Sequence, residues 1–158
     1  MTNKISTNKK GFTIIEVVLV LAIAGLIFLM VFVALPALQR SQRDTQRRND
    51  MSRLATAITN WQANHTNSLP ASSNTAELLN SYLKQSDGEF KDPSGNNYTI
   101  AISSLTDGAT KDPSANPQID IVTNAFCDGG KAKGGGGAGK YAILYKLEGA
   151  GTYCQDNS

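Results

Sequence analysis

The sequence predicts an α+β protein in which a long N-terminal α-helix precedes a small globular head with a short antiparallel β-sheet. Three observations favour this fold class. Residues 17–38 form an uncharged apolar run, residues 51–61 place apolar side chains at helical spacing, and three strand-like runs follow residue 97. The 158 residues leave room for one modest soluble core after the apolar run.

The apolar run has the length of a membrane span. Val17 to Leu38 are 22 consecutive residues without a charge, and at about 1.5 Å per residue they form roughly 33 Å of helix, which matches a bilayer core. Lysines at positions 4, 9 and 10 precede the run and suit a cytoplasmic flank. Five arginines in residues 39–65 favour the opposite orientation by a simple tally. We nevertheless expect the head outside the cytoplasm, because of its cysteines.

A secretory signal peptide is the alternative interpretation of the N-terminus. Residues 22–24, "AIA", offer a small-residue cleavage site. The apolar run, however, continues to Leu38, and the hydrophobic part of a signal peptide rarely contains a glutamate such as Glu16. A retained membrane anchor is therefore the favoured interpretation.

The same helix is predicted to continue beyond the membrane. Residues 39–50, "QRSQRDTQRRND", have no apolar stripe and are expected to form a helix with little to bury. Apolar residues then recur at i, i+3, i+7 and i+10, and this face is expected to dock on a sheet; they are Met51, Leu54, Ile58 and Trp61. We predict one helix over residues 12–65, with residues 12–38 as its transmembrane part.

The remaining residues, 66–158, are predicted to form the globular head. A short helix is expected near Asn74, where "NTAE" resembles a capping box. Three strand-like runs follow, separated by turn-forming Asp, Pro, Gly and Asn; they are residues 98–103, 118–123 and 141–147.

Composition excludes several kinds of site. The net charge of +2 hides a segregated distribution, and no segment is basic enough to indicate nucleic-acid binding, which stays uncertain as a partner. Two cysteines and one histidine exclude a multi-ligand zinc cluster, so we expect no metal and no cofactor. In a membrane-anchored chain with a polar head, the cysteine pair favours one disulfide in an oxidising compartment.

No catalytic constellation is visible, so the protein is not expected to be an enzyme. Residues 134–141, "GGGGAGKY", fit the G-x-x-x-x-G-K skeleton of a phosphate-binding loop. Tyr141 stands where that loop needs Ser or Thr, and a strand follows instead of a helix, so a flexible loop is predicted. His65 has no other histidine with which to form a site.

The N-terminal stretch "KKGFTIIEVVLVLAIAGLIFLMVFVALPAL" resembles the N-terminus of type IV pilins and pseudopilins. It has a short Lys-rich leader, then Gly11, Phe12, Thr13, Glu16 and the apolar helix. The resemblance implies a class III signal sequence whose leader, residues 1–11, is removed by a prepilin peptidase between Gly11 and Phe12. It also implies N-methylation of the new Phe12 amine.

By the same resemblance, Glu16 pairs with the Phe12 amine of a neighbouring subunit during filament assembly. An unpaired carboxylate in an apolar environment is costly, so a subunit that supplies a cation in the right register removes that cost. The alternative is that Glu16 reaches the lipid headgroups and plays no part in assembly.

The resemblance implies a structural subunit of a type IV pilus, used for surface adhesion, twitching motility or DNA uptake. Its partners are lipid of the cytoplasmic membrane before assembly and copies of itself in an extracellular helical filament afterwards. An assembly ATPase and a membrane platform protein act on it indirectly.

Features of the head keep alternatives open. Cys127 and Cys154 resemble the boundaries of the disulfide-bounded region of pilins, and closing the 28 residues between and including them contributes about 3.6 kcal/mol in the chain-entropy treatment. Residues 91–98, "KDPSGNNY", are similar to a turn motif of major pseudopilins, with Ser94 in place of an aromatic. A major pseudopilin of a type II secretion or competence system is thus one alternative, and a monomeric membrane-anchored binding protein is another.

Overall fold

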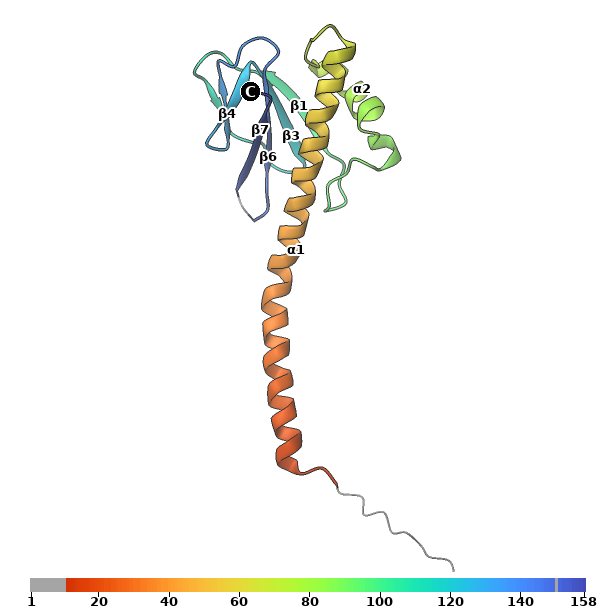
Figure 1. Cartoon of the computed structure of the whole chain (residues 1–158), viewed down its shortest axis with the longest axis vertical. Coiled ribbons are helices and arrows are strands. Elements are labelled where there is room, and N and C mark those ends of the chain that lie inside the picture. The colour runs from red at the N-terminus through yellow and green to blue at the C-terminus, as the bar shows by residue number, and fades with distance from the viewer. Residues whose placement is uncertain (1–10, 150) are drawn as a thin grey trace, which may run out of the picture. The chain divides into compact units, whose positions relative to one another are not determined.

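The computed structural model describes residues 11–149 and 151–158, so most of the predicted leader lies outside the described residues (Figure 1). The chain divides into two compact units, Met1–Leu38 and Gln39–Ser158. The helix α1 runs from Ile14 to Asn64 and contains this division. It continues through Pro36, which lies two residues before the division. The long N-terminal helix predicted from the sequence is therefore present.

Short helical turns follow α1 in the head. Their bounds are Ser72–Asn74 (a 3-10 turn), Thr75–Glu77 (α2), Leu78–Tyr82 (a π-helical turn) and Gln85–Asp87 (a 3-10 turn). The predicted helix near Asn74 thus exists, but its α-helical part is only α2, and the Asn74 side chain makes no capping hydrogen bond. Leu78 and Leu83 are buried and pack with Trp61 in the core, so tertiary contacts stabilise these turns where a cap does not.

Seven strands form two sheets in the part of the head that the structure describes. They are β1 (Thr99–Ser104), β2 (Thr110–Lys111), β3 (Gln118–Thr123), β4 (Ala125–Asp128), β5 (Lys131–Gly134), β6 (Tyr141–Lys146) and β7 (Thr152–Asp156). The larger sheet has the order β1-β3-β6-β7 and the smaller one the order β2-β5-β4. The three predicted strands correspond to β1, β3 and β6. The prediction of an α+β head rich in antiparallel pairing is confirmed.

One pair departs from the predicted antiparallel arrangement. β1 and β3 run parallel, with Thr99 opposite Gln118 and Ser104 opposite Thr123. Antiparallel neighbours are usually joined by a tight turn, whereas a parallel return needs a connection of about a dozen residues or more. Residues 105–117 provide that length, and β2 within them pairs with β5 of the smaller sheet. The long connection therefore permits the parallel pairing.

Both faces of the larger sheet are covered. In β6, Tyr141, Ile143 and Tyr145 pack in one core cluster with the buried face of α1, whereas Ala142 and Leu144 pack in a second cluster with residues of β4 and β5. This alternation follows from the two-residue period of a strand. Figure 1 shows the C-terminal part of α1 and the strand β4 on opposite sides of this sheet. All four residues of the predicted apolar face of α1, Met51, Leu54, Ile58 and Trp61, are buried in the first cluster.

A disulfide joins the two sheets. Cys127 on β4 and Cys154 on β7 are bonded, with their Cα atoms 5.8 Å apart. β4 belongs to the smaller sheet and β7 is an edge strand of the larger one. The predicted pairing is confirmed, and the covalent link ties the smaller sheet to the larger one.

The polar stretch of α1, residues 39–50, has more buried side chains than its composition predicts. Asp44, Arg47 and Asp50 are all buried, and the exposed fraction of Arg47 is 1%. The expectation that this stretch has little to bury is wrong, because these charged side chains find partners on other elements of the head. A buried charge is tolerated when it is paired and hydrogen-bonded.

Arg47 lies at the centre of a buried charge network. Its Nε and Nη2 atoms donate to the two carboxylate oxygens of Asp92 at 2.7 and 3.0 Å. Its Nη1 donates to Asp44 at 3.1 Å, and its Nη2 lies 2.8 Å from Oε1 of Glu148. The Arg47 guanidinium thus contacts three carboxylates. Its bidentate pair with Asp92 is the strongest of these contacts.

Asp92 connects this network to the turn formed by residues 91–98. The carboxylate also accepts hydrogen bonds from the backbone N–H of Ser94 at 2.8 Å and from the Tyr145 hydroxyl at 2.8 Å. At the end of the turn, the Tyr98 hydroxyl donates to Asp50 at 3.0 Å. The aspartate of "KDPSGNNY" therefore orders the turn and attaches it to α1.

The turn between β6 and β7 is attached to the same part of α1. Asp44 accepts the backbone N–H groups of Glu148 and Gly149 at 2.9 and 2.8 Å. The Glu148 carboxylate also accepts a hydrogen bond from Arg43 Nη2 at 2.6 Å. Two turns that are distant in sequence thus meet one face of α1.

The carboxylates of the network have displaced pKa values. Burial opposes the ionisation of Asp92 and Asp44, but hydrogen bonds outweigh it and hold the pKa of each below its usual range. The bonds to Asp92 come mainly from Arg47 and Ser94. Hydrogen bonds from Arg43 and Arg47 lower the pKa of Glu148 to about 2. Asp50 differs, because its burial dominates and raises its pKa.

Replacing Arg47 with methionine should destabilise the head by about 3–5 kcal/mol, because Asp92 would be left buried without its bidentate partner. Arg43→Met is the matched control. Arg43 contacts Glu148 near the surface, with 33% of its side chain exposed, so its replacement should destabilise the head much less than that of Arg47. Denaturant unfolding of the full chain in detergent, followed by the fluorescence of the single tryptophan, measures both. Equal losses in the two variants would show that the buried network does not govern stability.

Acid should weaken the head. A carboxylate whose pKa is lowered in the folded state stabilises the protein above its unfolded pKa, and this stabilisation is lost as the pH falls through the folded value. For Glu148 that window runs from about 4.5 to about 2. Among the described residues, five carboxylates have lowered pKa values, Asp44, Asp92, Asp120, Glu148 and Asp156, whereas the raised pKa of Asp50 acts in the opposite sense.

The denaturant concentration at the midpoint of unfolding should therefore decrease as the pH is lowered from 5 to 2. In the Arg47→Met variant this midpoint should depend less on pH, because the carboxylates of Asp44, Asp92 and Glu148 have lost their common partner. A midpoint that stays constant over this range in the parent protein would contradict the assigned role of the network.

Candidate functional site: the N-terminal helix

The start of α1 is organised around Thr13 and Glu16. The helix begins at Ile14, so Thr13 is its N-cap residue and Glu16 is the third helical residue. The Thr13 hydroxyl lies 3.3 Å from the backbone N–H of Glu16, which donates to it. In return, the Glu16 carboxylate accepts hydrogen bonds from the Thr13 backbone N–H at 3.3 Å and from its hydroxyl at 3.1 Å. These reciprocal bonds form a capping box.

Sequence reasoning assigned Glu16 only to assembly or to the lipid surface, and missed this local role. The signal was available, because Thr-x-x-Glu ahead of an apolar run is the pattern of a capping box. Both bonds from Thr13 reach the same oxygen, Oε2. Within the described part of the chain, Oε1 of Glu16 accepts no hydrogen bond. The cap therefore leaves one carboxylate oxygen for a further donor.

Gly11 and Phe12, the residues of the predicted cleavage site, precede the helix. Both are exposed and have no regular secondary structure, and the exposed fraction of Phe12 is 87%. A peptide bond in such a segment is sterically open to a protease. Glu16 lies beside Phe12 in an open hollow whose other lining residues are Val17, Val20 and Leu21. The structure thus brings together the predicted cleavage, methylation and assembly residues at one end of α1.

The apolar run of α1 makes almost no contact with the rest of its own unit. All residues from 11 to 42 are exposed except Ala24, which is half-buried. Large side chains such as Leu26, Phe28 and Phe32 expose 64–75% of their surface. The helix is long and apolar enough to cross a membrane, a test that a signal sequence near an N-terminus also passes.

Such a surface is unfavourable in water. Removing apolar surface from water contributes roughly 25 cal/mol per Å², and contiguous apolar patches on soluble monomers rarely exceed a few hundred Å². A helix that is apolar on all sides requires lipid or other apolar chains around it. The N-terminal half of α1 is therefore a surface for membrane or protein contact, consistent with membrane anchoring.

The glycine-rich stretch is followed by the strand β6 at Tyr141, whereas a phosphate-binding loop of this pattern leads into a helix. The Lys140 ammonium group donates to the backbone carbonyl of Asn157 at 2.8 Å, so it is already engaged by the C-terminal segment. Asn124 anchors the loop, because its side chain accepts the N–H of Gly137 and its backbone carbonyl accepts those of Gly135 and Gly136. The loop is thus held by hydrogen bonds, which differs from the flexible loop predicted.

His65, the other residue considered from the sequence, is half-buried beside the core residue Trp61. The His65 ring stacks on Trp61 with 3.9 Å between ring centroids, and its Nδ1 lies 3.0 Å from the Trp61 carbonyl oxygen. Among the described residues there is no group of three or more His, Cys, Asp or Glu side chains able to hold a metal ion. The N-terminal end of α1 is therefore the candidate functional site.

Comparison with known proteins agrees with this assignment. A family model described as the prokaryotic N-terminal methylation motif matches residues 6–32. No curated protein and no solved structure matches the chain. The matched segment contains Gly11, Phe12, the capping box and most of the apolar run. The chain thus carries an N-terminal methylation motif at the start of a long apolar helix, which is consistent with the class III signal of type IV pilins and pseudopilins.

Proposed function

We propose that the protein is the structural subunit of a type IV pilus, a helical filament of many copies of this chain. The observation that carries the proposal is the single carboxylate, Glu16, at the head of an apolar helix whose side chains the described residues of its own unit leave exposed. Such a helix has two suitable environments, lipid and a bundle of identical helices. The subunit would use the first before assembly and the second afterwards.

Processing at the methylation motif would create the cation that assembly needs. A prepilin peptidase would cut between Gly11 and Phe12, and the new amine of Phe12 would then be N-methylated. The methylated amine keeps its positive charge and can donate a hydrogen bond. In the filament it would meet Oε1 of Glu16 in a neighbouring subunit, while Oε2 stays in the capping box.

This charge pair would set the axial register of the filament. Apolar helices can slide along one another at little cost, because dispersion contacts are not directional. A carboxylate in an apolar environment, in contrast, carries a penalty of several kcal/mol unless a partner reaches it. Only one axial position of the incoming subunit brings its Phe12 amine to Glu16, so that position is selected.

The head would face the exterior and form the outer surface of the filament. Its disulfide supports an oxidising compartment. The protein's role in this proposal is structural and not enzymatic, so an assembly ATPase and a membrane platform protein would supply the work of filament growth. Adhesion, twitching motility and DNA uptake are the activities such a filament serves.

A major pseudopilin of a type II secretion or competence system is the second candidate. The turn of residues 91–98 favours it, because the turn resembles a pseudopilin motif and is attached to α1 through Asp92 and Tyr98. Electron microscopy of the cell surface separates the candidates. Long filaments that disappear on deletion of the gene indicate a pilin, whereas their absence indicates a pseudopilin or a monomeric binding protein.

The mature protein should begin at N-methylated Phe12. Gly11 has no side chain and precedes the helix, so the Gly11–Phe12 bond suits a peptidase acting beside the Lys-rich leader. Mass spectrometry of the N-terminal peptide measures both the start and the added methyl group. A protein that starts at Met1, or at Gly25 after "AIA", would contradict both pilin and pseudopilin assignments.

Glu16→Gln and Glu16→Leu should leave processing and membrane insertion intact but make filaments scarce or absent. Glutamine still completes a capping box, whereas leucine does not, so the glutamine variant removes the charge and keeps the cap. Glu77→Gln, at an exposed position of α2, is the control and should assemble normally. The measurement is the ratio of sheared filament protein to membrane-held subunit at equal expression.

The two variants also distinguish the roles of Glu16. Failure of only the leucine variant would show that Glu16 acts through the helix cap. Normal assembly of both would show that Glu16 merely contacts the membrane surface, and the proposed register mechanism would be wrong.

A further inference from the structure

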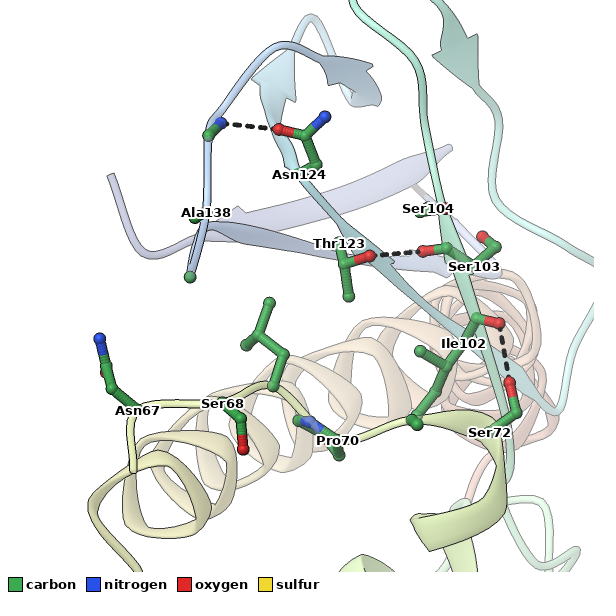
Figure 2. Close-up of a pocket in the computed structure, with 14 residues that line it drawn as sticks. Asn67, Ser68, Pro70, Ser72, Ile102, Ser103, Ser104, Thr123, Asn124 and Ala138 are labelled. Carbon is green, nitrogen blue, oxygen red and sulfur yellow. Dashed lines mark hydrogen bonds between the residues drawn. The ribbon is translucent and has the colours of Figure 1, made fainter. Parts of the chain in front are cut away.

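An open groove of about 740 Å³ lies in the head, at the carboxyl ends of the parallel strands β1 and β3 (Figure 2). One wall is the segment of residues 67–72 that follows α1, and another is the glycine-rich loop at residues 137–139. This volume is within the range of ligand pockets, about 300–1,000 Å³. The carboxyl ends of parallel strands are also a common position for ligand sites in sheets that contain them.

The groove is uncharged. None of its fourteen lining residues has an ionisable side chain, although charged residues make up 18% of the sequence. A phosphate or carboxylate ligand would have no cation to pair with here, and a basic ligand would have no anion. The composition therefore selects a neutral ligand.

Hydroxyl and amide groups supply the polar surface. Seven of the lining residues are serine, threonine or asparagine. The Asn67 amide makes no hydrogen bond to the described residues, and Figure 2 shows it at one wall of the groove. The exposed Ser104 lies at the end of β1. Such groups both donate and accept hydrogen bonds, as the hydroxyls of a ligand do.

Apolar side chains complete the surface. Leu69, Pro70 and Ile102 line the groove between the polar groups, and Pro70 is buried. The faces of a sugar ring present C–H groups, whereas its edge presents hydroxyls. A surface that combines apolar side chains with hydroxyls and amides complements both parts of such a ring.

The polar groups are held in place before a ligand arrives. The Thr123 hydroxyl donates to the Ser103 carbonyl at 3.3 Å, and the Asn124 amide donates to the Leu105 carbonyl at 3.0 Å. The Asn124 oxygen in turn accepts the N–H of Gly137 at 2.8 Å, which fixes the glycine-rich wall. Pre-ordered groups lose less conformational entropy on binding, so a shallow site retains useful affinity.

We propose that this groove binds a neutral saccharide. An extended peptide is the competing ligand, because β1 is an edge strand and an added strand pairs with such an edge. The Ser72 hydroxyl, however, donates to the Ile102 carbonyl at 3.2 Å and occupies an acceptor on that edge. The observations therefore favour the saccharide. The proposal goes beyond filament assembly and does not depend on it.

Binding is tested on the full-length isotope-labelled chain in a detergent without a sugar headgroup. Amide chemical shifts are recorded while triacetylchitotriose, and separately maltotriose, is added. At least one of them should saturate, with shifts confined to the groove and a Kd of about 1 mM or tighter. Glucose 6-phosphate should produce no saturable shift at these residues, because the groove has no cation.

Ser104→Arg should weaken this binding at least tenfold, since it places a long charged side chain in the groove. Ser81→Arg is the matched control, because Ser81 is also exposed but lies outside the groove, and it should bind as the parent does. Unchanged shifts elsewhere in the spectrum show that each variant is folded.

Three results would overturn the proposal. Neither saccharide saturates, the shifts fall outside the groove, or Ser104→Arg binds as tightly as Ser81→Arg. A fourth result is saturation by an acetylated neutral peptide of alternating Thr and Val with no response to either saccharide. That result would assign the groove to strand pairing instead.

Discussion

The ion pairs of the buried Arg47 guanidinium fix how the elements of the head are arranged. The guanidinium joins α1 to the turn of residues 91–98 through Asp92 and to the β6–β7 turn through Glu148. An apolar face alone would allow α1 to slide or rotate on the sheet, because hydrophobic contact is not directional. A bidentate pair between a guanidinium and a carboxylate has one good geometry. The apolar residues therefore supply most of the burial, and Arg47 selects one docking position.

The two parts of α1 differ in whether their own chain supplies partners for their charged side chains. In the head, Arg47 is satisfied by carboxylates of its own chain, and the network is complete within the subunit. At the other end, Glu16 receives hydrogen bonds only from Thr13 within the described residues, and one of its oxygens is left open. A complete network stabilises a fold, whereas an incomplete one stabilises an assembly when a partner supplies the missing cation. This difference is the physical basis of the proposed division between head and filament core.

Elements with a local signal were predictable. The apolar residues from Met51 to Trp61 repeat at helical spacing, and all of them lie in the core of the head. The strand runs around residues 99, 118 and 141 were visible because β-rich residues stand between turn formers. The disulfide could be predicted from composition, since the sequence contains two cysteines that can pair with each other. The capping box at Thr13 and Glu16 has an equally local signal, the pattern Thr-x-x-Glu ahead of an apolar run.

Features that depend on contacts between distant residues could not be predicted from the sequence. Arg47 and Asp92 are 45 positions apart, and neither differs in sequence from a charged residue on a solvated face. The parallel pairing of β1 and β3 depends on where the long connection between them turns back, which no short pattern specifies. The groove gathers residues from four separate stretches of the chain. Its lining residues look like ordinary loop residues until the sheet brings them together.

Short stretches of the sequence indicate the N-terminal methylation motif, a helix long and apolar enough to cross a membrane, and the α+β class of the head. Each of these depends on neighbouring residues and on a fixed period, so a short stretch is sufficient to specify it. The fold of the head, in contrast, determines which charges are buried, how the strands pair and where the neutral groove lies. These depend on contacts between distant residues, whose energies are set by burial and by the geometry of the partner.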